Sequence, residues 1–426
     1  MPFLTLQDPR AKVKGSRDPL GLVPLWYVPA RRLIGNLTTA TGSLRGFTLT
    51  LLGRWYGERL VREERITEAD ALPVFLRVEQ IGAYVRWLAH KDGDTRGIDR
   101  VKRHVDARGT TVPIGTGPDA RILSDQKVYG LWGLYSAATR ASGLLREGPV
   151  GLAPPAREFV EQTYGSHLRA LDRHLLPLVE KGGRLNIRRN SKLMAALGEI
   201  LPNPITADEA AWYGEWIRDG LHVESLPPRR QQRVVDLVLR HTDLDEEIDR
   251  TVMERMRDHA TNEDPGLARR LQQVLDLEAL LVPADLAFEF LQAQDGRTPT
   301  EVATALRDRW GGSPPHLHAN RLDAVIDTVT GDGNEALRTA IRRTAHGLVR
   351  GDYEEAVGGL LAWNDQVMRN RGGAPWIVLG DGGRLSVNWS ARERRLPDGD
   401  ELVTRWHNSY FLQSAQRIAA AVEAAR

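Results

Sequence analysis

The chain has 426 residues, of which 58 are basic and 56 acidic, so its formal net charge is +2 at pH 7. It contains no cysteine, which excludes disulfides, a thiol nucleophile, iron–sulfur clusters and cysteine-ligated zinc sites. A hydrophobic content of 41% and a charged content of 27% are typical of a folded globular protein. At roughly 100–200 residues per domain, the length predicts about two to four domains.

The small net charge hides an uneven distribution along the chain. Residues 1–110 carry a net charge of +7 and residues 111–200 carry +4, whereas residues 201–300 carry −9 and residues 301–426 are neutral. All seven lysines lie in the first 200 residues. Such asymmetry predicts contact with nucleic acid, with a charged partner, or between the two charged segments themselves.

Neither an export signal nor a membrane span is expected. Asp8 and Pro9 stand where a signal peptide needs an apolar region. No run of about 18 apolar residues occurs, which is the minimum for a membrane-spanning helix. We therefore expect a cytoplasmic protein with no membrane partner.

Turn-forming residues are frequent up to residue 43, after which apolar residues recur at helical spacing. The pattern predicts helices over residues 44–60, 78–89 and 97–107. We expect residues 1–110 to form a basic N-terminal helical domain. The third helix carries three exposed cations that could bind nucleic acid, namely Arg100, Lys102 and Arg103.

Residues 122–145 predict a helix that two internal glycines weaken, each by about 1 kcal/mol relative to alanine, so a turn or a close packing contact is expected there. A short glycine-containing turn and a helix that opens on two prolines follow. This order resembles a winged helix, with residues 142–145 and 150–152 as the wing strands. The resemblance implies a winged-helix-like domain over residues 111–200, in which the recognition helix offers three side chains to DNA: Gln126, Lys127 and Arg140. The aromatic residues between them are equally typical of a packing or partner surface.

The densest basic stretch runs from residue 181 to residue 192. Spaced cations after flexible glycines suit contacts with phosphates, which give affinity independent of base sequence. A solvated linker between domains is the alternative interpretation. The cations concerned are Lys181, Arg184, Arg188, Arg189 and Lys192.

Successive helical patterns fill residues 201–371, which we expect to form an acidic helical domain. Two of these helices are predicted at 265–281 and 284–294. Apolar stretches on both sides of a Gly-Asp-Gly-Gly turn predict a β-hairpin, and a final helix is predicted from about residue 400 to the end. Residues 372–426 are therefore expected to form a C-terminal hairpin–helix module. The predicted fold class is mainly α, multi-domain, with a winged-helix-like segment and a C-terminal β-hairpin plus helix.

Catalytic and metal-binding motifs are weak. Asp119, and Asp125 with the Gln-Lys that follows it, have the residue types of a restriction-type nuclease motif. That motif places its two elements on separate strands of a hairpin, whereas Asp125 begins a predicted helix here. The histidine pairs 167/174 and 316/318 have no carboxylate at ligand spacing. We therefore predict no catalytic residue, no metal and no cofactor.

Segments near both ends resemble an uncharacterised bacterial family found near antiphage defence genes. The resemblance is carried by GSRDPLG, GNLTT, RVEQ and SDQKVYGLWGLY in the first 165 residues and by WHNSYFLQS near the end. It implies a role in bacterial defence and brings no catalytic residues with it.

These observations predict a non-enzymatic subunit of a multi-protein bacterial antiphage defence or DNA-processing assembly. Its basic half would bind DNA or RNA, and its acidic helical region would dock other subunits. Two alternatives stay open. One is a nuclease or other metal-dependent enzyme of such a system, which Asp125→Ala would inactivate, and the other is a winged-helix transcription regulator.

Overall fold

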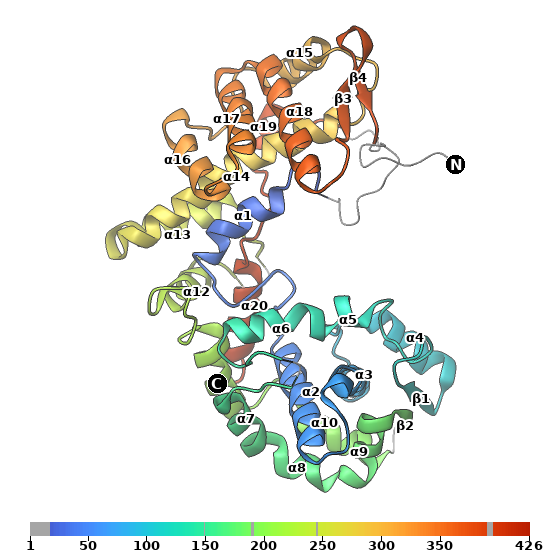
Figure 1. Ribbon diagram of the computed structural model, residues 1–426. Coiled ribbons are helices and arrows are strands. Elements are labelled where there is room, and N and C mark those ends of the chain that lie inside the picture. Colours follow the sequence, from blue (N-terminus) through green and yellow to red (C-terminus); the bar gives the residue numbers. More distant parts are fainter. Residues whose placement is uncertain (1–17, 149, 189–190, 244–245, 390–394) are drawn as a thin grey trace, which may run out of the picture. The chain divides into compact units, whose positions relative to one another are not determined.

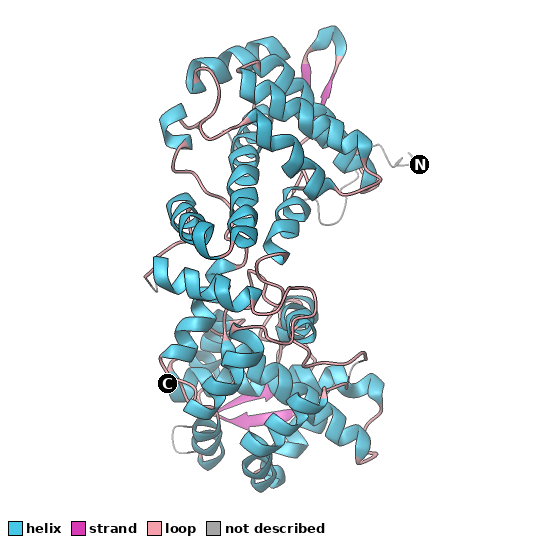
Figure 2. Ribbon diagram, turned by 90° about the vertical axis from the view of Figure 1, so that its left-hand side faces the viewer, coloured by secondary structure: helices cyan, strands magenta, loops and turns pink. Residues whose placement is uncertain are grey.

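The computed structural model describes residues 18–148, 150–188, 191–243, 246–389 and 395–426. It is mainly helical, which confirms the predicted fold class (Figure 1). The chain divides into two compact units. Unit 1 consists of Met1–Leu33 and Glu247–Tyr410, and unit 2 consists of Ile34–Glu246 and Phe411–Arg426. Figure 2 shows that the strands of the described residues form two short pairs among the helices.

Unit 2 is organised around two long helices, α2 (Leu44–Arg62) and α3 (Ala71–His90). Their close packing depends on glycines, because a Cβ on Gly53 would lie 2.5 Å from the ring of Phe75. The other helical elements of unit 2 are η1 (Glu68–Asp70), α4 (Ile98–Arg108), α5 (Gln126–Tyr129), α6 (Leu131–Ala141), α7 (Pro154–Val160), η2 (Glu161–Gly165), α8 (Ser166–Ala170), α9 (Asp172–Lys181), α10 (Lys192–Ile200), α11 (Ala207–Tyr213), η3 (Gly214–Arg218), α12 (Arg230–His241) and α20 (Leu412–Glu423).

A two-stranded antiparallel sheet joins distant parts of unit 2. Strand β1 (Thr111–Ile114) pairs with β2 (Gly183–Asn186), so that Thr111 lies opposite Asn186. The pairing brings the residues that follow α4 next to those that precede α10.

The winged-helix-like segment is present in part. After α6, Leu145 and Leu152 form one isolated antiparallel bridge, so the expected pair of wing strands is reduced to this single contact among the described residues. The predicted recognition helix is broken into α5 and α6 at Gly130, which has an extended conformation. A Cβ on Gly130 would lie 2.6 Å from a carboxylate oxygen of Glu79, so the glycine allows the close contact. Helix α6 also packs against α2, so this segment is part of the larger core of unit 2.

Unit 1 is centred on α14 (Pro265–Leu291), which was expected as two helices. Pro283 lies inside it, and every residue from 274 to 284 is buried, so packing on all sides overrides the local preference for a break. The other helices of unit 1 are α1 (Leu22–Arg31), α13 (Arg250–Glu263), α15 (Pro299–Trp310), α16 (Ala319–Thr330), α17 (Glu335–Arg350), α18 (Tyr353–Asn370) and α19 (Gly399–Leu402).

The predicted C-terminal hairpin forms from β3 (Ile377–Leu379) and β4 (Leu385–Val387), with η4 (Asp381–Gly383) between them. The single final helix that we expected is instead interrupted between α19 and α20. Buried Glu278 of α14 accepts hydrogen bonds from His407 N–H at 2.6 Å and from the Tyr410 hydroxyl at 2.6 Å. These bonds hold the residues between α19 and α20 in a non-helical path. The β3–β4 hairpin belongs to unit 1, whereas α20 belongs to unit 2.

None of the described helices is long and apolar enough to span a membrane.

Candidate nucleic-acid interface

The charge contrast along the sequence is much weaker between the two units. Unit 2 contains 32 basic and 28 acidic residues and has a net charge of +4, whereas unit 1 contains 26 and 28 and has −2. Two exchanges account for this: the acidic residues 201–246 fold with the basic first half of the chain, and the basic residues 1–33 belong to unit 1. A nucleic-acid interface must therefore be argued from a local cluster of cations.

Such a cluster surrounds a half-buried tryptophan at the end of α3. The Nζ atom of Lys91 lies 5.0 Å from the centre of the Trp87 ring, and the Nζ atom of Lys102, on α4, lies 4.6 Å from it. Both distances are in the range of cation–π attraction, which favours lysine rotamers that place the ammonium groups near the ring. Two positive charges are thus held next to one aromatic ring.

The local fold explains this arrangement. Trp87 and Lys91 are four residues apart, and Lys91 N–H donates to Trp87 O at 3.0 Å as the helix ends. Lys91 has a left-handed backbone, with φ of 55°, which ends α3 beside the tryptophan. Fully buried Val101 and a 2.7 Å hydrogen bond between Tyr84 and His104 hold α4 against α3, which places Lys102 at the same ring.

An open pocket of about 610 Å³ adjoins this cluster. It lies between the end of α3 and the start of α10, and no carboxylate is among the described residues that line it. Within the described residues, Lys91, Lys102 and Arg188 form no salt bridge, so their charges are available to an anion. We call Trp87, Lys91, Lys102 and Arg188 the basic–aromatic patch. The pocket is lined by Leu88, Ala89, Lys91, Ile187, Arg188, Met194 and Ala195.

The structure brings several predicted cations onto neighbouring elements. Figure 1 shows α4, β1 and β2 next to one another in unit 2, and α10 follows β2 in the chain. Lys102 lies on α4, Arg188 shortly after β2 and Lys192 at the start of α10, and Arg188 and Lys192 are exposed. Arg184, on β2, donates to Thr111 Oγ1 at 2.8 Å.

The remaining predicted cations differ in their surroundings. Arg100 donates to Arg121 O and Arg103 to Asp99 O, each at 3.3 Å. Lys181 lies 3.8 Å from Glu180. Arg189 lies outside the described residues.

Gln126 does not face a ligand as predicted. Its side chain is 1% exposed and donates to Glu79 at 2.8 Å and to Leu76 O at 3.0 Å, while it accepts from Gln80 at 3.0 Å. A residue with these partners holds α5 to α3 and cannot reach a base edge. Lys127 and Arg140 are exposed, on α5 and α6.

No protein-family model, curated protein or solved structure matches this chain.

Sequence reasoning missed Trp87 and Lys91, which organise the patch. A tryptophan followed four residues later by a lysine, at the point where a helical pattern meets Asp-Gly-Asp, was the available signal. The second lysine contact joins two helices, and no sequence spacing shows it.

Asp125, which the nuclease alternative would use, has a structural role in this fold. The carboxylate of Asp125 accepts from Val128 N–H at 3.1 Å and so caps α5. Among the described residues, no group of three histidine, aspartate or glutamate side chains could hold a metal ion. The nuclease alternative gains no support from these positions.

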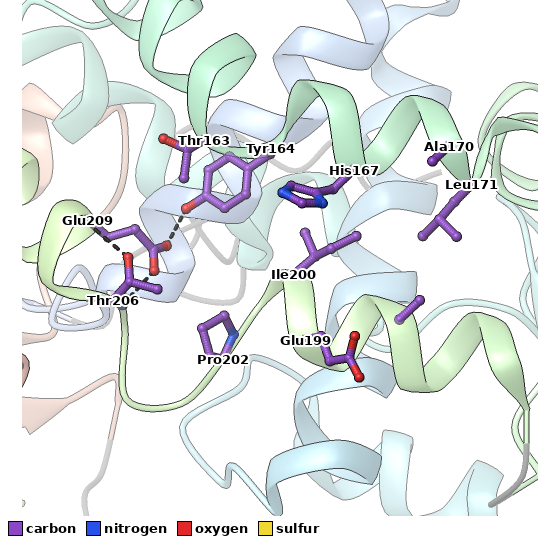
Figure 3. A pocket seen from close by; sticks show the side chains of 11 residues that line it. Thr163, Tyr164, His167, Ala170, Leu171, Glu199, Ile200, Pro202, Thr206 and Glu209 are labelled. Atoms are coloured by element: carbon purple, nitrogen blue, oxygen red, sulfur yellow. Dashed lines mark hydrogen bonds between the residues drawn. The ribbon is translucent and has the colours of Figure 1, made fainter.

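A second open pocket, of about 410 Å³, lies in the same unit (Figure 3). Figure 3 shows the Tyr164 hydroxyl and Thr206 directed at Glu209, and Glu209 also forms a buried salt bridge with Arg45. Although burial by itself raises the pKa of Glu209, the Arg45 guanidinium holds it below its ordinary value. Every oxygen of this carboxylate therefore has protein partners, and we assign the ion pair to stability.

Proposed function

We propose that the protein is a non-enzymatic nucleic-acid-binding subunit of a multi-protein bacterial defence or DNA-processing assembly, and that the basic–aromatic patch is its phosphate-binding site. The observation that carries this proposal is the pair of lysines held on the Trp87 ring, with Arg188 across the adjoining pocket. Placement in a defence assembly is supported by the family resemblance of the sequence alone.

Phosphate contacts explain why the cations are arranged in this way. Two ammonium groups held at one ring repel each other, and an anion bound near them lowers that repulsion. The guanidinium of Arg188 adds a donor fork that suits phosphate oxygens. Binding through such contacts is independent of base sequence and weakens as salt is raised.

The test is a binding titration with fluorescently labelled DNA and RNA at low and moderate salt. The wild type should bind, and a triple variant with Lys91→Asn, Lys102→Gln and Arg188→Gln should bind at least about tenfold more weakly, because it lacks three phosphate contacts. Asparagine is chosen at position 91 because it tolerates the left-handed backbone.

Lys127→Gln is the matched control, since Lys127 is an exposed lysine of the same unit outside the patch. It should bind like the wild type. If Lys127→Gln weakens binding and the triple variant does not, the α5–α6 surface is the interface and the assignment of the patch is wrong.

The assembly is tested separately by purification of the protein from its native host. Stoichiometric co-purification of the same proteins in independent preparations is expected. A protein that elutes alone, under salt conditions that preserve complexes, contradicts this part of the proposal.

A further inference from the structure

The pocket beside the basic–aromatic patch combines an apolar interior with cations at its margin. Ile187 and Met194 are buried, and Leu88 is half-buried, so apolar side chains form part of the wall. Lys91 and Arg188 line the same pocket and provide its charges. A flat phosphate-binding surface needs the cations but has no use for such a hollow.

This shape distinguishes between two forms of nucleic acid. In a duplex the bases are stacked inside the helix, and a protein meets phosphates and groove edges. In a single strand the bases are free to leave the stack and to pack on protein side chains. A pocket of about 610 Å³ lies within the size range of small-ligand sites and is large enough for one base with its sugar.

We infer that the patch takes single-stranded nucleic acid, with one unpaired base in this pocket and the adjoining phosphates on Lys91 and Arg188. This inference rests on the proposed function and names the ligand class of the same site. The thioether of Met194 suits such a ligand, because sulfur makes favourable contacts with aromatic rings.

The pocket also predicts weak discrimination among bases. Among the described residues that line it, the polar side chains are Lys91 and Arg188, and both are hydrogen-bond donors. A base is therefore held mainly by packing, which every base permits. Single strands of different sequence should bind with similar affinity.

The experiment compares three labelled probes on the full chain: oligo(dT) of about 12 nucleotides, the same strand with abasic sites, and a duplex of equal length. The intact single strand should bind about tenfold more tightly than the other two, since a base packed against Leu88, Ile187 and Met194 removes apolar surface from water. The abasic probe removes the base and keeps the phosphates, so it tests the pocket without any change to the protein.

A variant pair tests the same inference from the protein side. Ala195 is exposed and lines this pocket, so Ala195→Trp should fill it and weaken binding of the intact strand about tenfold, with duplex binding unchanged. Ala170 is also exposed and lines the other pocket, so Ala170→Trp is the matched control and should have no effect.

The outcomes separate this inference from the proposed function. If neither single strand nor duplex binds, the proposed function itself is overturned. If all three probes bind with equal affinity, the patch binds nucleic acid but the inference of a single-stranded ligand is wrong.

Discussion

Glu79 shows how one residue links the two parts of the interrupted helix to α3. It is 3% exposed and accepts hydrogen bonds from Leu131 N–H at 2.7 Å and from Gln126 at 2.8 Å. Burial raises the pKa of Glu79 to about 7, although these hydrogen bonds lower it. The carboxylate therefore titrates near neutral pH in the folded protein.

This pKa gives a prediction with a definite sign. The pKa of Glu79 is about 4.5 without burial and is raised to about 7 in the folded protein. The protonated carboxyl therefore contributes stability that is fully present below about pH 4.5. This contribution is lost as the pH rises through about 7. The free energy of unfolding of the wild type, relative to Glu79→Gln, should fall by on the order of 3 kcal/mol between these limits. Urea denaturation of both proteins at about pH 5 and about pH 8 measures this. Glu199→Gln, at an exposed position on α10, is the control, and equal pH dependence of the wild type and Glu79→Gln would contradict the account.

The buried salt bridge between Arg45 and Glu209 gives a second prediction at this scale. Arg45→Met leaves the Glu209 carboxylate buried without its cation, which should lower the free energy of unfolding by about 3–5 kcal/mol. Arg45→Met with Glu209→Leu removes both charges and should recover part of this loss. Denaturant titration checks both variants, and a double variant less stable than the single one argues against the ion-pair explanation.

At the scale of elements, the close packing of α2 leaves different amounts of space around its glycines. A Cβ on Gly53 would lie 2.5 Å from the Phe75 ring, whereas one on Gly57 would lie 3.5 Å from its nearest neighbours. Gly53→Ala should therefore destabilise the protein by about 1–3 kcal/mol through overpacking. Gly57→Ala should be neutral or stabilising by up to about 1 kcal/mol, because alanine favours the helix. Thermal denaturation compares the two, and equal melting temperatures would show that the helices are not closely packed at Gly53.

The elements that the sequence predicted well are those with local signals. Apolar spacing predicted α2 and α4 nearly to the residue, and the glycine-rich turn predicted the β3–β4 hairpin. The pairing of β1 with β2 was not predictable, because it joins segments with no sequence signal for each other. The prediction of two helices at α14 was wrong, because the helix continues through Pro283 where it is buried on all sides. Gln126 likewise had the residue type of a base-reading side chain, and only the fold shows that its partners are Glu79 and Gln80.

At the scale of the whole molecule, the fold redistributes the charge. The two halves that differ strongly along the sequence become units of +4 and −2, since residues 201–246 fold with the basic half. Net charge therefore gives little steering toward nucleic acid, and affinity must come from local contacts. This makes the patch, rather than overall charge, the central element of the proposed function.

The most direct test of the patch is the salt dependence of nucleic-acid binding. The slope of log Kd against log salt concentration counts the phosphates that the protein neutralises, at about 0.7–0.9 per contact. For the triple variant with Lys91→Asn, Lys102→Gln and Arg188→Gln, we predict a slope lower than that of the wild type by about 2 to 3. An unchanged slope in this variant would show that nucleic acid binds elsewhere and would contradict the account.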